Sequence, residues 1–250
     1  MQVLIDNLII NYEIMGKGKS ILFIHGWGDD LNSLKKAFSS LSKTNQLIFI
    51  DLPGFGKSEL PKDGLKISDF SKLIQSFCQK LNLKIYVIIG HSFGGAVAIK
   101  TLANNYLNPD KLILLDASGI REVNKTKLIL KTASKAGKLL ASPLPYNLKN
   151  KLRKQFYNKI KSDYLLNEGM KETFKKIVSE DLSHDASLIK NNTLIIYGEE
   201  DLETPIRQAY LLHELIKNST LEIVGDAGHF VFIDQNKKVL NLAKDFLDAK

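Results

Sequence analysis

Short apolar runs recur along the chain and predict a set of buried strands. Four of them are continuous rather than alternating, at residues 21–24, 47–50, 85–89 and 112–115. Two more lie nearer the C-terminal end, at residues 193–197 and 221–224. Continuous apolar runs of this length are typical of parallel strands whose two faces are both covered. We therefore expect a sheet with helices on both of its sides.

The segments between these runs have helical spacing. Apolar residues recur at intervals of three and four in residues 31–41 and again in residues 70–81, where Ser68 is a candidate N-cap. Further helices are expected at residues 96–102, 205–217 and 237–247.

The first residues follow a different pattern. Residues 3–5 and 8–14 are separated by Asp6 and Asn7, which favour a tight turn, so we predict an antiparallel pair. Beyond this pair strands and helices alternate, and such alternation produces right-handed βαβ crossovers. The predicted fold is α/β, with a doubly wound and mostly parallel sheet of about eight strands.

One segment interrupts the alternation. Residues 119–189 contain no strong strand signal, many lysines and apolar residues at helical spacing. We interpret this segment as a helical insertion after the sixth strand. Residues 1–118 and 190–250 then form a single core domain.

The net charge of +8 is concentrated near this insertion. Residues 117–190 hold 16 basic and 7 acidic residues, whereas the rest of the chain holds 19 and 20. A solvated, lysine-rich face explains this excess. The alternative is recognition of an acidic partner, such as an anionic substrate, an anionic membrane surface or an acidic carrier protein. Nucleic acid is not expected, because no binding motif accompanies the charge.

Other features of the composition narrow the class of protein. With 44% hydrophobic and 25% charged residues, the chain has the balance of a globular protein rather than a disordered one. No window approaches eighteen apolar residues, so we expect no spanning helix. The first residues lack the basic region of a secretory signal, and the single Cys78 has no disulfide partner, so a reducing cytoplasm is expected.

The most informative motif lies at the end of the apolar run at residues 85–89. Residues 85–96 read as a strand, then Gly90-His91-Ser92-Phe93-Gly94, then a helix. A strand that reverses sharply into a helix holds the residue at the bend in a strained conformation and projects its side chain at the sheet edge. Ser92 is therefore a candidate nucleophile.

A serine hydroxyl needs a base, and the base needs an acid that orients it. His229 follows the last predicted strand and Asp201 follows the strand before it, so both belong to loops at the same edge of the sheet. We predict that His229 is the base and Asp201 the acid. Asp116, just beyond another strand, and the neighbours Glu199 and Glu200 remain alternatives for the acid.

A second turn supplies candidate hydrogen-bond donors. His25-Gly26-Trp27-Gly28 follows the strand at residues 21–24, and such a turn can point backbone amides at a developing oxyanion. We expect the amides of Trp27 and Phe93 to form this oxyanion hole. His25 and His91 flank the site and are expected to orient loops rather than transfer protons.

Together these motifs resemble the α/β-hydrolase fold, from near residue 8 to the end of the chain. The matching segments are His25-Gly26-Trp27-Gly28, residues 51–58 (Asp-Leu-Pro-Gly-Phe-Gly-Lys-Ser), residues 90–95, Asp201 and Gly228-His229. The resemblance implies that residues 119–189 form a helical cap over the site. Dehalogenases and epoxide hydrolases of this fold use an Asp nucleophile, so Ser92 disfavours those activities.

The function expected from this resemblance is a serine hydrolase that cleaves a carboxylic ester or related acyl bond. Neither a metal ion nor an organic cofactor is needed for this chemistry. Aromatic residues are expected to shape an apolar acyl pocket: Trp27, Tyr146, Phe156, Tyr157 and Phe174. Two alternatives are a carbon–carbon bond hydrolase acting on ring-cleavage dienoates and a ligand-binding protein with slow turnover.

Overall fold

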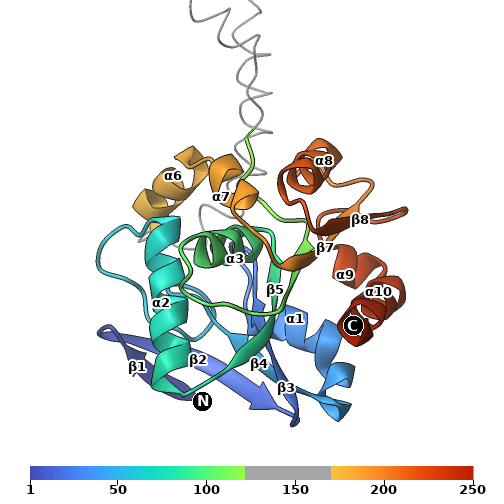
Figure 1. Cartoon of the computed structure of the whole chain (residues 1–250). Helices are drawn as coiled ribbons and strands as arrows, with labels where there is room; N and C mark the ends of the chain where they lie inside the picture. Colours follow the sequence, from blue (N-terminus) through green and yellow to red (C-terminus); the bar gives the residue numbers. More distant parts are fainter. Residues whose placement is uncertain (122–169, 250) are drawn as a thin grey trace, which may run out of the picture.

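An eight-stranded sheet organises the chain (Figure 1), and the structure, a computed structural model, describes residues 1–121 and 170–249. The strands occur in the spatial order β1-β2-β4-β3-β5-β6-β7-β8. Their bounds are β1 (Gln2–Ile5), β2 (Leu8–Met15), β3 (Lys19–Ile24), β4 (Asn45–Ile50), β5 (Ile85–His91), β6 (Lys111–Leu115), β7 (Asn192–Gly198) and β8 (Ser219–Val224). All eight lie within a few residues of the predicted strands.

Strand directions also agree with the prediction. β1 pairs with β2, and β2 with β4, in antiparallel register, while the strands from β4 to β8 along the sheet are parallel to one another. Asp6 and Asn7 form the turn between β1 and β2 with φ angles of 47° and 67°. Asp and Asn tolerate this left-handed conformation better than other side chains do.

Helices cover both faces of the sheet (Figure 1), which is why the strands are apolar throughout. On β3, Leu22 and Ile24 pack into one core, whereas Ile21 and Phe23 pack into the other. The first core lies under α2 (Ile67–Lys80), α3 (Phe93–Ala103), α7 (Ser183–Ser187) and α8 (Ile206–Leu215). The second lies under α1 (Leu31–Phe38), α9 (Val231–Asp234) and α10 (Asn236–Asp248).

Two helical details differ from the prediction. The first helix ends at Phe38 and continues as a 3₁₀ turn, η1 (Ser39–Lys43). The helix expected to start after Ser68 begins at Ile67 instead, and the side chain of Asp69 accepts a hydrogen bond from the backbone amide of Lys66 at 2.8 Å. Asp69 satisfies a donor that Ser68, already inside the first turn, cannot reach.

The predicted insertion falls between β6 and β7. Its described part contains α6 (Lys171–Ser179) and α7, and Lys100 of α3 binds both Glu180 and Asp185 there, at 3.0 and 2.9 Å. Residues 122–169 lie outside the described part, so the cap remains a prediction. Within the described ranges no helix combines the length and apolar character needed to span a bilayer.

Candidate active site

Ser92 occupies the sharp bend between β5 and α3. Its φ and ψ are 48° and −115°, a conformation that few non-glycine residues adopt. The amide of Ser92 donates to the carbonyl of Leu115 at 2.9 Å, which holds the bend against the end of β6. Gly94 allows this arrangement, because a Cβ at its position would overlap the carbonyl oxygen of Ile24.

Three side chains from separate loops meet at this bend. The hydroxyl of Ser92 lies 2.9 Å from Nε2 of His229, and Nδ1 of His229 lies 2.9 Å from Oδ2 of Asp201. In this arrangement the imidazole accepts from the serine hydroxyl and donates to the carboxylate. The structure thus brings together the three residues selected from the sequence.

Asp201 is held by the turn that follows it. Its Oδ1 accepts from the backbone amides of Glu203 and Thr204 at 2.7 and 2.9 Å, and the hydroxyl of Thr204 donates to Oδ2. Burial works to raise the pKa of Asp201, but the hydrogen bonds from His229 and Thr204 outweigh it and hold this pKa below its ordinary value. Asp201 is therefore a carboxylate at neutral pH.

The charge of Asp201 acts in turn on the imidazole. Burial works to lower the pKa of His229, but the hydrogen bond and the charge of Asp201, with a contribution from Glu203, outweigh it and raise this pKa above its ordinary value. The nearby carboxylates therefore stabilise the protonated form of His229.

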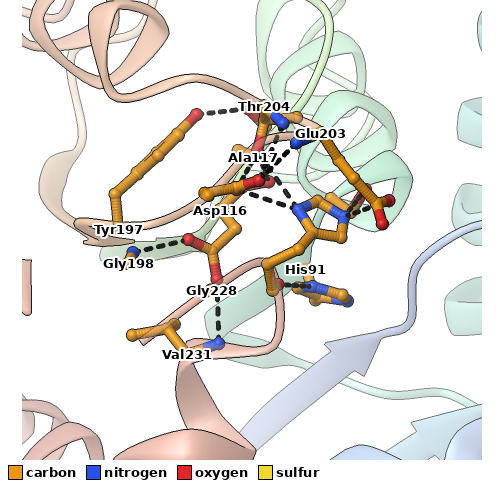
Figure 2. Close-up of polar contacts among 12 residues, drawn as sticks. His91, Asp116, Ala117, Tyr197, Gly198, Glu203, Thr204, Gly228 and Val231 are labelled. Carbon is orange, nitrogen blue, oxygen red and sulfur yellow. Dashed lines mark hydrogen bonds and ion pairs between the residues drawn. The ribbon is translucent and has the colours of Figure 1, made fainter. Parts of the chain in front are cut away.

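Asp116 is fully buried and occupies a different place (Figure 2). One of its oxygens accepts from the amide of Gly198 at 2.8 Å and the other from the amide of Val231 at 3.1 Å. Burial is the main cause that raises the pKa of Asp116 to about 8. Both oxygens are thus engaged by backbone amides, and one of these bonds fixes the chain two residues after His229.

The two flanking histidines also contact backbone groups. Nε2 of His25 accepts from the amide of Leu52 at 3.0 Å, and its Nδ1 donates to the carbonyl of Gly26 at 2.7 Å. Nε2 of His91 donates to the backbone oxygen of His229 at 2.8 Å. Burial lowers the pKa of both side chains, that of His91 to about 3, so both are neutral at pH 7.

The turn after β3 lies directly against Ser92. A Cβ added to Gly26 would lie 2.9 Å from Nδ1 of His91 and 3.2 Å from Cβ of Ser92, so this close approach depends on glycine. The rings of Trp27 and Phe93 lie 5.6 Å apart. Phe93 is the first residue of α3, and an amide at this position has no partner within its own helix. The two segments expected to supply oxyanion donors are thus neighbours.

Trp27 also lies at the centre of an aromatic group. Its ring centroid is 4.8 Å from that of Phe55 and 5.2 Å from that of Phe174 in α6. Of the predicted acyl-pocket residues, Trp27 and Phe174 therefore lie in contact with each other. The other three lie outside the described residues: Tyr146, Phe156 and Tyr157.

A cavity of about 540 Å³ lies beside the loop that carries Asp201. Glu203 and Thr204 form part of its wall, and Ser118, Arg121 and Gln208 add polar groups. The remaining lining residues are apolar or acidic: Ile67, Ala96, Gly119, Ile120, Ile177, Val178 and Glu180. A cavity of this size suits a small organic molecule.

Sequence reasoning missed Thr204 and Glu203. Thr204 contacts Asp201, the backbone oxygen of Asp116 and, at 3.3 Å, Nδ1 of His229. The position of Thr204, three residues after the predicted acid Asp201 in a short loop, could have indicated this contact. Asp side chains in such loops commonly accept hydrogen bonds from the backbone amides that follow them. Within the described ranges no group of three His, Cys, Asp or Glu side chains could hold a metal ion.

Comparison with known proteins identifies the family to which this fold belongs. A sequence profile described as the alpha/beta hydrolase family matches residues 21–242, which is most of the chain. The chain belongs to the alpha/beta hydrolase family. The predicted fold class is therefore confirmed.

Relatives in the alpha/beta hydrolase family are of several kinds. The AB hydrolase superfamily protein YisY of Bacillus subtilis is 27% identical and covers 98% of this chain and 97% of its own. The monoacylglycerol lipase ABHD6 of Bos taurus is 28% identical, covering 93% of this chain and 76% of its own. A meta-cleavage product hydrolase (CumD) from Pseudomonas fluorescens IP01 shares the fold with a TM-score of 0.76 and 22% identity, over 99% and 97% of the two chains.

Proposed function

We propose that this alpha/beta hydrolase is a serine hydrolase that cleaves a carboxylic ester or related acyl bond through an acyl-enzyme. One observation carries the proposal: the hydroxyl of Ser92, at a strained bend, lies 2.9 Å from an imidazole that a buried carboxylate holds at 2.9 Å. A serine hydroxyl attacks a carbonyl only when a base removes its proton, and this geometry provides one.

The proposed reaction has two halves. His229 takes the proton from Ser92 as the Ser92 oxygen attacks the carbonyl carbon, and Asp201 stabilises the resulting imidazolium. The backbone amides of Trp27 and Phe93 bind the oxyanion, and His229 then protonates the leaving alcohol. A water molecule deprotonated by His229 attacks the acyl-enzyme, which releases the acid and restores Ser92.

The choice of an ester follows from the sequence relatives. ABHD6, at 28% identity, is named as a lipase of monoacylglycerols, which are esters. The likeness to the meta-cleavage product hydrolase, at 22% identity, is one of fold and does not favour carbon–carbon bond cleavage.

Two further parts of the proposal concern the surroundings of the site. We propose that residues 119–189 form a cap, and that Tyr146, Phe156 and Tyr157 shape an apolar acyl pocket together with Trp27 and Phe174. The contact between Phe174 and Trp27 supports this, because it brings a residue of the insertion to the turn beside Ser92. We also propose a cytoplasmic location, supported by the absence of a cysteine that could pair with Cys78.

The test is covalent labelling of the intact protein with a fluorophosphonate, a reagent that reacts with activated serines. We expect stoichiometric labelling and hydrolysis of short-chain esters, both lost in Ser92→Ala. Ser187→Ala, which removes an exposed hydroxyl in α7, is the matched control and should label normally. Labelling without ester hydrolysis would favour the ligand-binding alternative, and labelling that survives Ser92→Ala would refute the proposal.

A further inference from the structure

Glu203 places a second carboxylate beside the reacting centre. The side chain of Glu203 is labelled in Figure 2. Its Oε2 lies 3.6 Å from Nε2 of His229, the same nitrogen that faces the hydroxyl of Ser92. The carboxylate oxygen of Glu203 and the hydroxyl oxygen of Ser92 both lie within 3.6 Å of Nε2 of His229, so they lie within about 7 Å of each other. At a partly buried site, the charge of Glu203 acts appreciably over this distance on a charged group bound near Ser92. The proposed chemistry does not use this carboxylate.

The position of Glu203 is set by the turn that holds the proposed acid. The amide of Glu203 donates to Oδ1 of Asp201 at 2.7 Å, and Asp201 in turn binds His229. Thr204, the next residue, binds the same carboxylate through its amide and its hydroxyl. The backbone beneath Glu203 is therefore fixed relative to the imidazole, while its side chain, 45% exposed, faces the cavity of about 540 Å³.

Among the described residues, the other charged groups that line this cavity form no ion pair with Glu203. Glu180 is paired with Lys100 at 3.0 Å, and Arg121 uses its Nε to bind the backbone oxygen of Glu180 at 3.1 Å. In the described part of the chain the ionic contact of Glu203 is with His229 alone. When His229 is neutral, the form that acts as the base, Glu203 has no oppositely charged partner within ion-pair distance among residues 1–121 and 170–249.

The imidazole itself faces several titratable groups. Asp201 and Glu203 are within 4 Å of its nitrogens, the charge of Asp116 acts on it, and His91 binds its backbone oxygen. Asp201 is needed to orient the ring, Asp116 is engaged by backbone amides and His91 is neutral. Glu203 is therefore the one of these four that presents a negative charge to the cavity side.

We propose that Glu203 determines which substrate charges the enzyme accepts. It favours esters that are uncharged or cationic near the scissile bond and disfavours esters that carry a carboxylate there. The inference rests on the proposed esterase function and names its substrate class. A substrate carboxylate bound in this cavity would meet Glu203 as a like charge, whereas an alkyl or quaternary ammonium group would not.

The test compares three methyl esters with four-carbon acyl chains that differ in terminal charge: methyl butyrate, monomethyl succinate and methyl 4-(trimethylammonio)butanoate. In the full-length protein we expect kcat/KM to be highest for the neutral and cationic esters. Glu203→Gln should raise the ratio of kcat/KM for the succinate ester to that for butyrate by about tenfold, the effect of removing one screened charge at this distance. It should lower the ratio for the cationic ester.

Glu200→Gln is the matched control. Glu200 carries the same charge in the same loop, is exposed, and forms no ion pair with His229 among the described contacts, so its removal should leave all three ratios unchanged. Equal changes for all three esters in Glu203→Gln, or the same shift in Glu200→Gln, would overturn the inference while leaving the esterase proposal intact.

A second readout does not depend on turnover. Because Glu203 contributes to the raised pKa of His229, Glu203→Gln should lower that pKa in an NMR titration of the imidazole, and Glu200→Gln should not. An unchanged His229 pKa in Glu203→Gln would show that the carboxylate does not act at this site. Loss of hydrolysis of every ester by the wild-type protein would instead refute the proposed function.

Discussion

Replacing Asp201 with asparagine tests the proposed acid most directly. The substitution keeps the shape of the side chain and removes one charge. Oδ1 of Asp201 accepts from two backbone amides, so the amide oxygen of asparagine is expected to remain there. Its NH2 group then replaces Oδ2 and faces Nδ1 of His229, now 2.9 Å from a donor instead of an acceptor.

This reversal fixes the wrong tautomer of the base. With Nδ1 accepting from the new amide, the proton of a neutral His229 must lie on Nε2, which can no longer take the proton of Ser92. Serine hydrolases with the corresponding change lose about 10⁴ in kcat, equivalent to about 5.5 kcal/mol of activation free energy. We expect a loss of this order in Asp201→Asn.

The assay is kcat for a short-chain ester, measured together with the rate of fluorophosphonate labelling and the thermal melting temperature. Asp116→Asn is the matched control, because Asp116 binds the backbone of Gly198 and Val231 rather than the imidazole. Asp116→Asn should retain far more activity than Asp201→Asn. Above pH 8, where the Asp116 carboxyl is ionised, it should also lower the melting temperature, since the NH2 group of asparagine would face a backbone donor. A decrease in kcat of less than tenfold in Asp201→Asn would refute the assignment of Asp201 as the acid. A larger decrease in kcat in Asp116→Asn than in Asp201→Asn would also refute it.

Two other outcomes follow from the geometry. The proposed mechanism requires neutral His229, whose pKa is raised, so kcat/KM should fall as pH decreases through a midpoint above 6.5. A pH–rate profile with a lower midpoint would contradict the pairing of His229 with Asp201. Gly26→Ala should reduce kcat by at least about tenfold, because the new methyl group would press on His91 and Ser92; a circular dichroism melt confirms folding, and unaltered kcat would contradict the close approach.

Much of the fold could be predicted because the strands are buried on both faces. Their apolar runs are continuous, as in residues 85–89, and this signal depends only on the local sequence. The ends of the helices were harder to predict from the sequence. Ser68 resembles an N-cap in sequence, but the amide that needs a partner belongs to Lys66, and Asp69 reaches it.

Some residues of the candidate site could likewise be predicted from the sequence, and others could not. Ser92, Asp201 and His229 were predictable because each follows a strand, and parallel strands end at one edge of the sheet. The same rule selects Asp116, and Glu199 and Glu200 lie in the same loop as Asp201, so sequence alone left several candidate acids. The directions of the two aspartate carboxylates distinguish Asp201 from Asp116. Glu203 was missed because its neighbour His229 lies 26 residues further along the chain, and side-chain proximity of that kind has no local pattern.

Ser92, Asp116, Asp201 and His229 follow β5, β6, β7 and β8, four strands that are neighbours in the sheet. The residues proposed to cleave the bond are therefore all held by one sheet, whereas the insertion between β6 and β7 is a separate segment of the chain. Under the proposed cap role, mutations in that stretch would change which substrates are accepted and leave the bend that carries Ser92 intact. Such modularity offers an evolutionary route by which a single ancestral framework gives rise to many hydrolases.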